Sequence, residues 1–137
     1  MFQSKYKNAI FSGLTALELL HQTDQIAKYV NITVTRGYKI NTNGETKFRI
    51  NYVDKKILNI GVIEVKSSVG NIVKCYCFER VLCDFIARQD KIEIGIFVNT
   101  IWSYADWEHK DYTKLFEIAE QLGVLEKVAK VMRLIRK

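Results

Sequence analysis

The sequence predicts an α+β fold: a leading helix, then four to five short, mostly antiparallel strands, then a C-terminal half of about four helices. Three observations carry this prediction. Apolar and polar residues alternate in short runs between residues 29 and 77, which is the period of strands with one buried face. After residue 78 the apolar residues recur every three or four positions, which is typical of amphipathic helices. Strands and helices therefore occupy different parts of the chain, unlike the regular alternation of a doubly wound sheet.

The first predicted helix covers residues 10–21. Leu14, Leu17 and Leu20 recur there at helical spacing and are expected to face the core. Ser12 precedes them and is a candidate N-cap, because its hydroxyl can accept a hydrogen bond from an unpaired backbone N–H of the first turn. We therefore expect a helix to open the fold.

Two strands are expected next, at about residues 29–35 and around residues 48–52. Both show the alternation of a half-buried strand. Gly37 and residues 41–44 lie between them and carry turn signals. A short turn between neighbouring strands is typical of an antiparallel pair.

Two further strands are predicted at residues 62–65 and 72–77. Gly70 and Asn71 lie between these segments and are typical hairpin-turn residues. We expect this pair to form a β-hairpin.

Helices are predicted from the end of the last strand onward. The first contains Val81, Leu82, Phe85 and Ile86 at helical spacing. The next three are expected at residues 92–105, 112–122 and 124–136. Asp111 is a candidate N-cap and Gly123 a candidate C-terminal stop for the middle one. The residues expected to face inward are Ile94, Phe97, Val98 and Ile101, then Leu115, Ile118, Ala119 and Leu122, then Val128, Val131, Met132 and Ile135.

The length and composition predict one domain covering residues 1–137. The chain shows no repeat and no linker rich in Gly, Ser or Pro, and it has no proline at all. Its apolar fraction of 48% is ordinary for a globular protein. No apolar run approaches the roughly 18 residues of a membrane span, and the first residues have no signal-peptide core. We therefore expect a cytoplasmic protein without membrane contact.

The charge is unevenly distributed along the chain. Residues 1–60 carry nine Lys or Arg against four Asp or Glu, residues 61–123 seven against ten, and residues 124–137 five against one. The basic ends could meet a polyanion or an acidic protein partner, or could serve only solubility.

The cysteines and histidines predict no cofactor or metal site. The chain has three cysteines, and their odd number argues against a disulfide framework. Cys75 and Cys77 are not at the usual zinc spacing, so buried free thiols are expected. His21 and His109 lack an evident partner for general-base work, and structural roles are favoured for both. We expect the protein not to be an enzyme.

One arrangement does point to catalysis. Glu64 and Lys66 share a face of a predicted strand, and Asp54 lies upstream. Metal-dependent nucleases use carboxylates in this way to hold a hard cation, with a lysine near the attacking water. The alternative is the solvated face of a strand, with Asp54 in a turn. A nuclease is therefore kept as an alternative function.

Three charged residues interrupt an otherwise apolar segment at the predicted strand-to-helix junction. Arg80 and Asp84 are four apart on the helix and can pair. Glu79 lies at the start of the helix, where a carboxylate is favoured. The set is expected to form a structural ion-pair network, and its alternative role is a partner contact.

Two groups of basic residues are candidates for contact with nucleic acid or a partner. Arg36, Lys39, Lys47 and Arg49 are expected to cluster around two strands and the turn between them, with aromatic residues interleaved. The second group lies on the outer side of the last helix and comprises Lys127, Lys130, Arg133 and Lys137. A nucleic-acid-binding module is therefore a second alternative function.

Several segments, in order, resemble the C-terminal domain of AbiEi-family antitoxins from type IV toxin–antitoxin and abortive-infection systems. The most specific runs from residue 70 to residue 84, Gly-Asn-Ile-Val-Lys-Cys-Tyr-Cys-Phe-Glu-Arg-Val-Leu-Cys-Asp. Residues 9–21, 32–38 and 116–124 are also similar. The resemblance covers nearly the whole chain. Val81 and Thr35 depart from the threonine and proline that the family has at these positions.

The resemblance implies a function in phage defence. In this family a winged-helix head binds the operator for transcriptional autoregulation, and the C-terminal domain counteracts a nucleotidyltransferase-like toxin, without necessarily forming a stable complex. The chain begins where that head would end. It is expected to retain antitoxicity and to lose most sequence-specific DNA binding, while its basic residues could still add non-specific DNA contacts.

Overall fold

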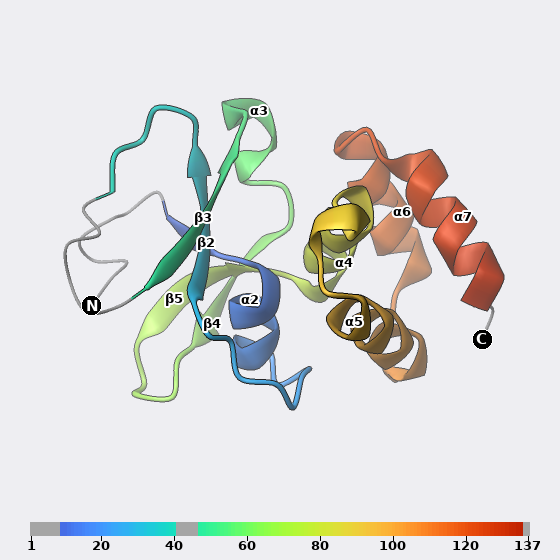
Figure 1. Cartoon of the computed structure of the whole chain (residues 1–137), viewed down its shortest axis with the longest axis horizontal. Coiled ribbons are helices and arrows are strands. Elements are labelled where there is room, and N and C mark those ends of the chain that lie inside the picture. The colour runs from blue at the N-terminus through green and yellow to red at the C-terminus, as the bar shows by residue number, and fades with distance from the viewer. Residues whose placement is uncertain (1–8, 41–46, 136–137) are drawn as a thin grey trace.

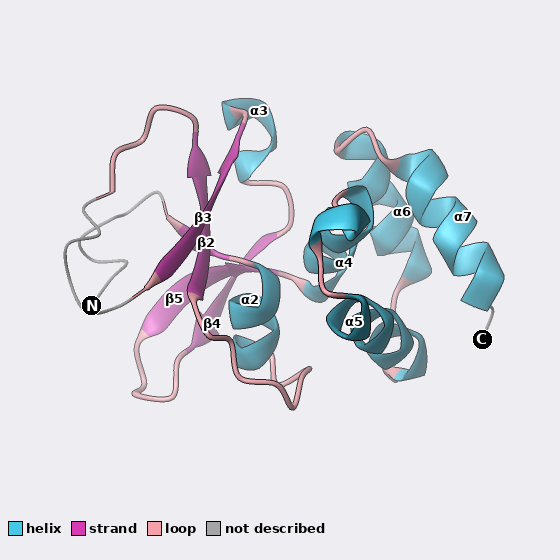
Figure 2. Cartoon of the chain, in the orientation of Figure 1, coloured by secondary structure: helices cyan, strands magenta, loops and turns pink. Residues whose placement is uncertain are grey.

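The computed structural model describes residues 9–40 and 47–135 of the chain. These residues form a mixed five-stranded sheet with short helices, followed by four helices (Figures 1 and 2). In chain order the elements are β1 (Ile10–Phe11), α2 (Gly13–Leu19), β2 (Val30–Thr35), β3 (Phe48–Val53), α3 (Lys55–Leu58), β4 (Val62–Lys66), β5 (Ile72–Tyr76), α4 (Phe78–Ala87), η1 (Gln89–Lys91), α5 (Ile94–Asp106), α6 (Tyr112–Gln121) and α7 (Leu125–Ile135). The expected α+β class is confirmed.

The sheet is mixed, and the expectation of mostly antiparallel strands is wrong. The strand order is β3-β2-β1-β5-β4. The β1–β2 and β4–β5 pairs are antiparallel, whereas the β1–β5 and β2–β3 pairs are parallel. The predicted hairpin is the β4–β5 pair, with Gly70 at φ +86° in its turn.

The parallel β2–β3 pair explains most of this error. Parallel neighbours need a crossover connection of about a dozen residues, because the chain must return to the starting edge. Residues 36–47 supply that length, but alternation alone does not distinguish a crossover from a hairpin. The turn predicted at residues 41–44 lies outside the described residues.

The start of the chain also differs from the expected helix at residues 10–21. Ile10 and Phe11 form a central strand, and α2 begins only at Gly13. Ser12 occupies the N-cap position, but its side chain makes no capping bond. It instead accepts a hydrogen bond from Thr33 in β2, at 2.9 Å. Pairing with strands on both sides decides the conformation of this short apolar segment.

The helical half agrees closely with the expected boundaries. Asp111 caps α6 by accepting a hydrogen bond from the backbone N–H of Lys114, and Gly123 follows the helix at φ +76°. The short helix α3 replaces the turn expected after Asp54. In α5, Ile94 and Val98 are exposed, so their predicted inward orientation is wrong.

Helix α4 joins the sheet to the helical half. It follows β5 directly and contacts α2, α5, α6 and α7. In Figure 1 it lies between the sheet and the other C-terminal helices. The main core surrounds it, and a smaller cluster on the sheet is formed by Ala9, Ile32 and Val34. The α4 part of the segment with the most specific family resemblance therefore lies at the centre of the molecule.

No helix in the described part of the chain is long and apolar enough to cross a membrane.

Candidate functional site

Arg80 is the central residue of a buried polar network at the β5–α4 junction. Its side chain is fully buried. Its Nε donates to both carboxylate oxygens of Asp84, at 3.2 and 3.1 Å. One Nη donates to the carbonyls of Ile57 and Ile60, both at 2.7 Å. The guanidinium carbon also lies 4.1 Å from the centroid of the Tyr76 ring. The predicted Arg80–Asp84 pair is therefore confirmed.

The network fixes the segment that follows α3 onto the junction. Tyr76 donates a hydrogen bond from its hydroxyl to the carbonyl of Leu58, at 2.7 Å. Together with Arg80 it satisfies three backbone carbonyls at the end of a short helix, where such groups have no partner within the helix. Burial raises the pKa of Asp84, and the positive charge of Arg80 opposes this rise.

Glu79 forms a second branch of the network, on the side of the C-terminal helices. It is 3% exposed. Its Oε2 accepts a hydrogen bond from the Tyr104 hydroxyl at 2.9 Å, and its Oε1 lies 3.6 Å from Nζ of Lys114. The Tyr104 oxygen also accepts the backbone N–H of Asp111 at 2.8 Å. Glu79 therefore links α4 to α5 and α6.

We predict that Tyr104→Phe lowers the free energy of unfolding by about 1–3 kcal/mol, the cost of leaving a buried hydrogen-bonding group unsatisfied. The substitution keeps the ring, which packs 5.0 Å from Phe78 between centroids. It removes only the hydroxyl shared by Glu79 and Asp111. Urea denaturation measures the change. Tyr52→Phe is the matched control, because Tyr52 is 46% exposed, and its stability should stay within about 0.5 kcal/mol of wild type.

The placement of Glu79, Arg80 and Asp84 favours a structural role for the predicted network. Glu79 and Arg80 are buried and bonded within the chain. A partner could reach only Asp84, whose side chain is 18% exposed. Partner contacts must therefore be sought on the surface.

The first group of basic candidates is divided between the two ends of a strand pair. Its members are Arg36, Lys39, Lys47 and Arg49. Arg36 donates its backbone N–H to Val53 at the end of β3, whereas Lys47 accepts from Val30 at the start of β2. The six-residue length of β2 separates these levels, which is roughly 20 Å at about 3.3 Å per residue. A single cluster of these four residues would require β2 and β3 to be antiparallel. Because the two strands are parallel, the four residues lie at two separate levels.

The four side chains nevertheless lie on the surface. All are exposed, and the Arg49 guanidinium lies 4.9 Å from the centroid of the Tyr29 ring. Such stacking orients an arginine without removing it from solvent. Each side chain could make a phosphate contact, but the four do not form one continuous patch.

The second basic group follows one exposed side of α7. Lys127, Lys130 and Arg133 are exposed, and Lys137 lies outside the described residues. Val128 and Met132 of the same helix are buried. The expected amphipathic arrangement of α7 is therefore confirmed.

The nuclease candidates are not brought together. Asp54 follows β3 and Glu64 lies in β4, which are the two edge strands of the sheet. Three strands lie between them. Asp54 caps α3 by accepting the backbone N–H of Lys56 at 3.1 Å. Glu64 and Lys66 are both exposed, and Glu64 is opposite Lys74 in the ladder. This arrangement matches the solvated face of a strand.

The described residues contain no group of three or more His, Cys, Asp and Glu that could hold a metal ion. His21 adopts a positive φ of 59° just after α2, and His109 lies beside Glu108 in an exposed connection. His21 lines a small pocket together with Thr23 and Ser103, and no hydrogen bond from it to either hydroxyl is found within the described residues.

We predict that the native protein does not react with thiol reagents at pH 8. Cys75, Cys77 and Cys83 are buried and free. Burial raises the pKa of Cys75 and Cys83 to about 12 and also raises that of Cys77. The thiolate is the reacting form, so almost none is present at pH 8. Titration with a chromogenic disulfide should detect no thiol in native protein and three in guanidinium. Rapid reaction of native protein would contradict the burial.

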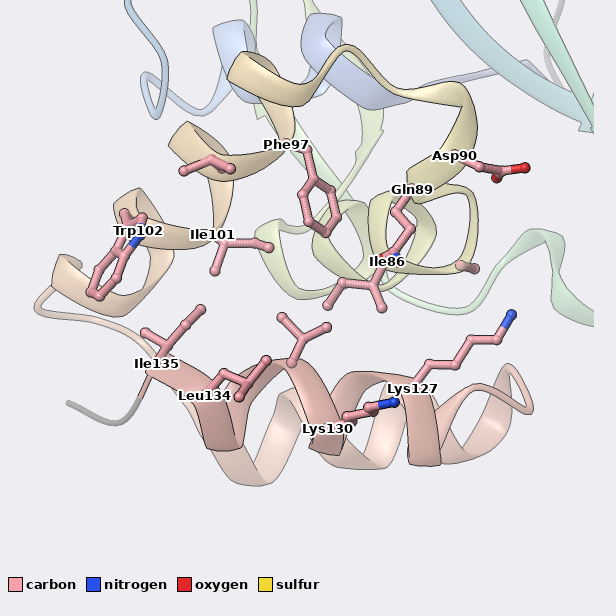
Figure 3. Close-up of a pocket in the computed structure, with 13 residues that line it drawn as sticks. Ile86, Gln89, Asp90, Phe97, Ile101, Trp102, Lys127, Lys130, Leu134 and Ile135 are labelled. Atoms are coloured by element: carbon pink, nitrogen blue, oxygen red, sulfur yellow. The ribbon is translucent and has the colours of Figure 1, made fainter.

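A groove between α5 and α7 is the surface feature that sequence reasoning missed. It is lined by apolar residues of both helices and by the end of α4, with Lys127 and Lys130 on the α7 side (Figure 3). Ile94, Val98 and Trp102 form an exposed apolar stripe along α5. Their spacing of four residues could have indicated a second apolar face, in addition to the buried face that contains Ile101.

No protein-family model matches the chain, and no curated protein matches it.

Proposed function

We propose that the chain is the toxin-neutralising domain of a type IV, AbiE-like toxin–antitoxin system. It counteracts a nucleotidyltransferase-like toxin, and it assists transcriptional autoregulation when joined to a DNA-binding head. The observation that carries the proposal is the ordered resemblance to AbiEi-family antitoxins, above all in residues 70–84. The proposed function needs neither a catalytic residue nor a cofactor in this chain.

The arrangement of the residues that carry the resemblance supports this proposal. They form the turn of the β4–β5 hairpin, strand β5 and most of α4, which connects the two halves of the molecule. Of the four charged residues in the segment, Glu79 and Arg80 join elements that are distant in sequence, and Asp84 pairs with Arg80. These contacts stabilise the junction, whichever toxin the domain counteracts.

The two alternative functions have less support. A nuclease would need Asp54 near Glu64, and the sheet holds them at opposite edges. A nucleic-acid module would benefit from a continuous basic surface, and the four residues around β2 and β3 are divided between two ends. Salt-dependent phosphate contacts by single residues remain compatible with the antitoxin proposal.

The proposal is tested by co-expressing the chain with a nucleotidyltransferase encoded beside it and measuring growth. We expect the chain to restore growth. Glu64→Ala should rescue equally well, because Glu64 is an exposed strand residue with no catalytic role in the proposal. Failure of rescue by soluble, folded chain would contradict antitoxicity of this part alone. Rescue that depends on Glu64 would favour the nuclease.

A further inference from the structure

The groove between α5 and α7 leaves large apolar side chains in contact with solvent. Leu134 is 83% exposed on the α7 side, and Val98 and Trp102 are each 43% exposed on the α5 side. Phe97 and Ile101 of α5 also line the groove (Figure 3). Contiguous apolar surface of this kind marks an interaction site more often than scattered single residues do. The groove has a volume of about 750 Å³, which is enough for several side chains of a partner.

The α7 side of the groove has the geometry of a helix-binding surface. Lys127, Lys130, Val131 and Leu134 are spaced i, i+3, i+4 and i+7, so they share one face along two turns of α7. This face is about 10 Å long at about 1.5 Å per residue. An amphipathic helix presents apolar residues over the same length when it lies in a groove.

Charge distinguishes between the possible occupants. Lys127 and Lys130 lie at one end of the groove, away from the apolar end with Trp102 and Ile135 (Figure 3). No ion pair is found for either lysine within residues 9–40 and 47–135. Among the residues that the structure describes, Asp90 is the only acidic one that lines the groove. The two lysines are therefore free to pair with carboxylates of an occupant.

We propose that this groove binds an acidic amphipathic helix of a partner protein. Apolar residues of that helix would cover Val98, Trp102 and Leu134, and carboxylates at one end of it would pair with Lys127 and Lys130. A second copy of the chain fits less well as the occupant. In a symmetric dimer two identical grooves would face each other, and each is lined by two lysines and one acidic residue. The groove would bind this helix whether or not the chain neutralises a toxin.

The test selects binders from a displayed library of amphipathic helices with leucines at i, i+3, i+4 and i+7 and random flanking residues. Selected helices should be enriched in Asp and Glu at one end. Fluorescence anisotropy then measures the affinity of a labelled synthetic helix from the selection. Leu134→Glu should weaken binding by about tenfold or more, as loss of a central contact does. Lys127→Glu with Lys130→Glu should also weaken it by about tenfold, because the carboxylates of the helix would then face like charges.

Two matched controls keep the total charge change equal. Val69→Glu alters an apolar residue that is 75% exposed in the β4–β5 turn, and Lys55→Glu with Lys66→Glu alters two exposed lysines on the sheet side. Both should bind the helix like wild type. All substituted side chains are exposed, so the variants should keep the wild-type unfolding midpoint.

Four results would overturn the proposal. The library could yield no enriched helix, or it could yield basic helices. The selected helices could also bind the groove variants and wild type equally. A dimer in light scattering that becomes a monomer with Leu134→Glu would assign the groove to a second copy instead.

Discussion

Arg80→Ala is expected to lower the free energy of unfolding by about 3–5 kcal/mol, the usual cost of removing one partner from a buried ion pair. The truncation removes the charge that pairs with Asp84 and the donor that satisfies Ile57 and Ile60. It also removes the contact with the Tyr76 ring. Such a loss is a large fraction of the total stability of a domain. Urea or guanidinium denaturation of purified protein measures it.

A control and a double variant separate the causes of this loss. Arg133→Ala makes the same chemical change on the exposed side of α7, and its effect should stay within about 0.5 kcal/mol. Arg80→Met with Asp84→Leu removes both charges while retaining apolar volume. If it is more stable than Arg80→Met alone, which keeps the apolar volume but leaves Asp84 unpaired, the cost lies mainly in the unpaired Asp84 and not in lost packing. An Arg80→Ala protein as stable as wild type would contradict the network.

Gly61→Ala is expected to cost about 2–4 kcal/mol, from backbone strain and steric overlap together. Gly61 has φ +81°, which an L side chain rarely adopts. A Cβ at this position would lie 2.8 Å from Cβ of Arg80 and 3.3 Å from Sγ of Cys77. Neither neighbour can withdraw easily, because both are buried in the β5–α4 junction. Thermal and urea unfolding measure the change.

Gly70→Ala provides the matched control for Gly61→Ala. Gly70 has a similar φ of +86°, and nothing lies within 4 Å of a Cβ placed there. Its substitution should cost only the backbone strain, about 1–2 kcal/mol. The difference between the two variants measures the steric contact with Arg80. If the two substitutions lowered the free energy of unfolding equally, the backbone around residue 61 would be able to move away from α4.

The sequence alone determined the type of most elements and much of their boundaries, but not strand β1 or helix α3. Residues 30–35, 48–53, 62–66 and 72–76 form strands because alternating β-branched and aromatic residues suit a half-buried sheet. The caps of α6 could also be predicted, since Asp111 and Gly123 act through their own local backbone. Local chemistry is sufficient for these features, so they do not depend on which partners the elements find.

The site was predictable only where its contacts are local. The Arg80–Asp84 pair follows from a spacing of four on one helix. The bond from Tyr104 to Glu79 joins residues 25 positions apart, and the bonds from Arg80 to residues 57 and 60 reach into another element. The spacing of residue types along the sequence does not predict such contacts, because they form only when α3, α5 and α6 are packed against α4.

Tertiary structure decided the direction of the strands and the faces of the helices. The alternation in β2 and β3 is the same in a parallel and an antiparallel pair, and only their pairing in the folded sheet shows that they are parallel. The parallel direction of β2 and β3 separates Arg36 from Lys47. In α5 both the Ile101 side and the Ile94, Val98 and Trp102 side are apolar, so periodicity could not choose between them. The packing of α4 and α5 buries Ile101, and it leaves the second stripe exposed beside the groove.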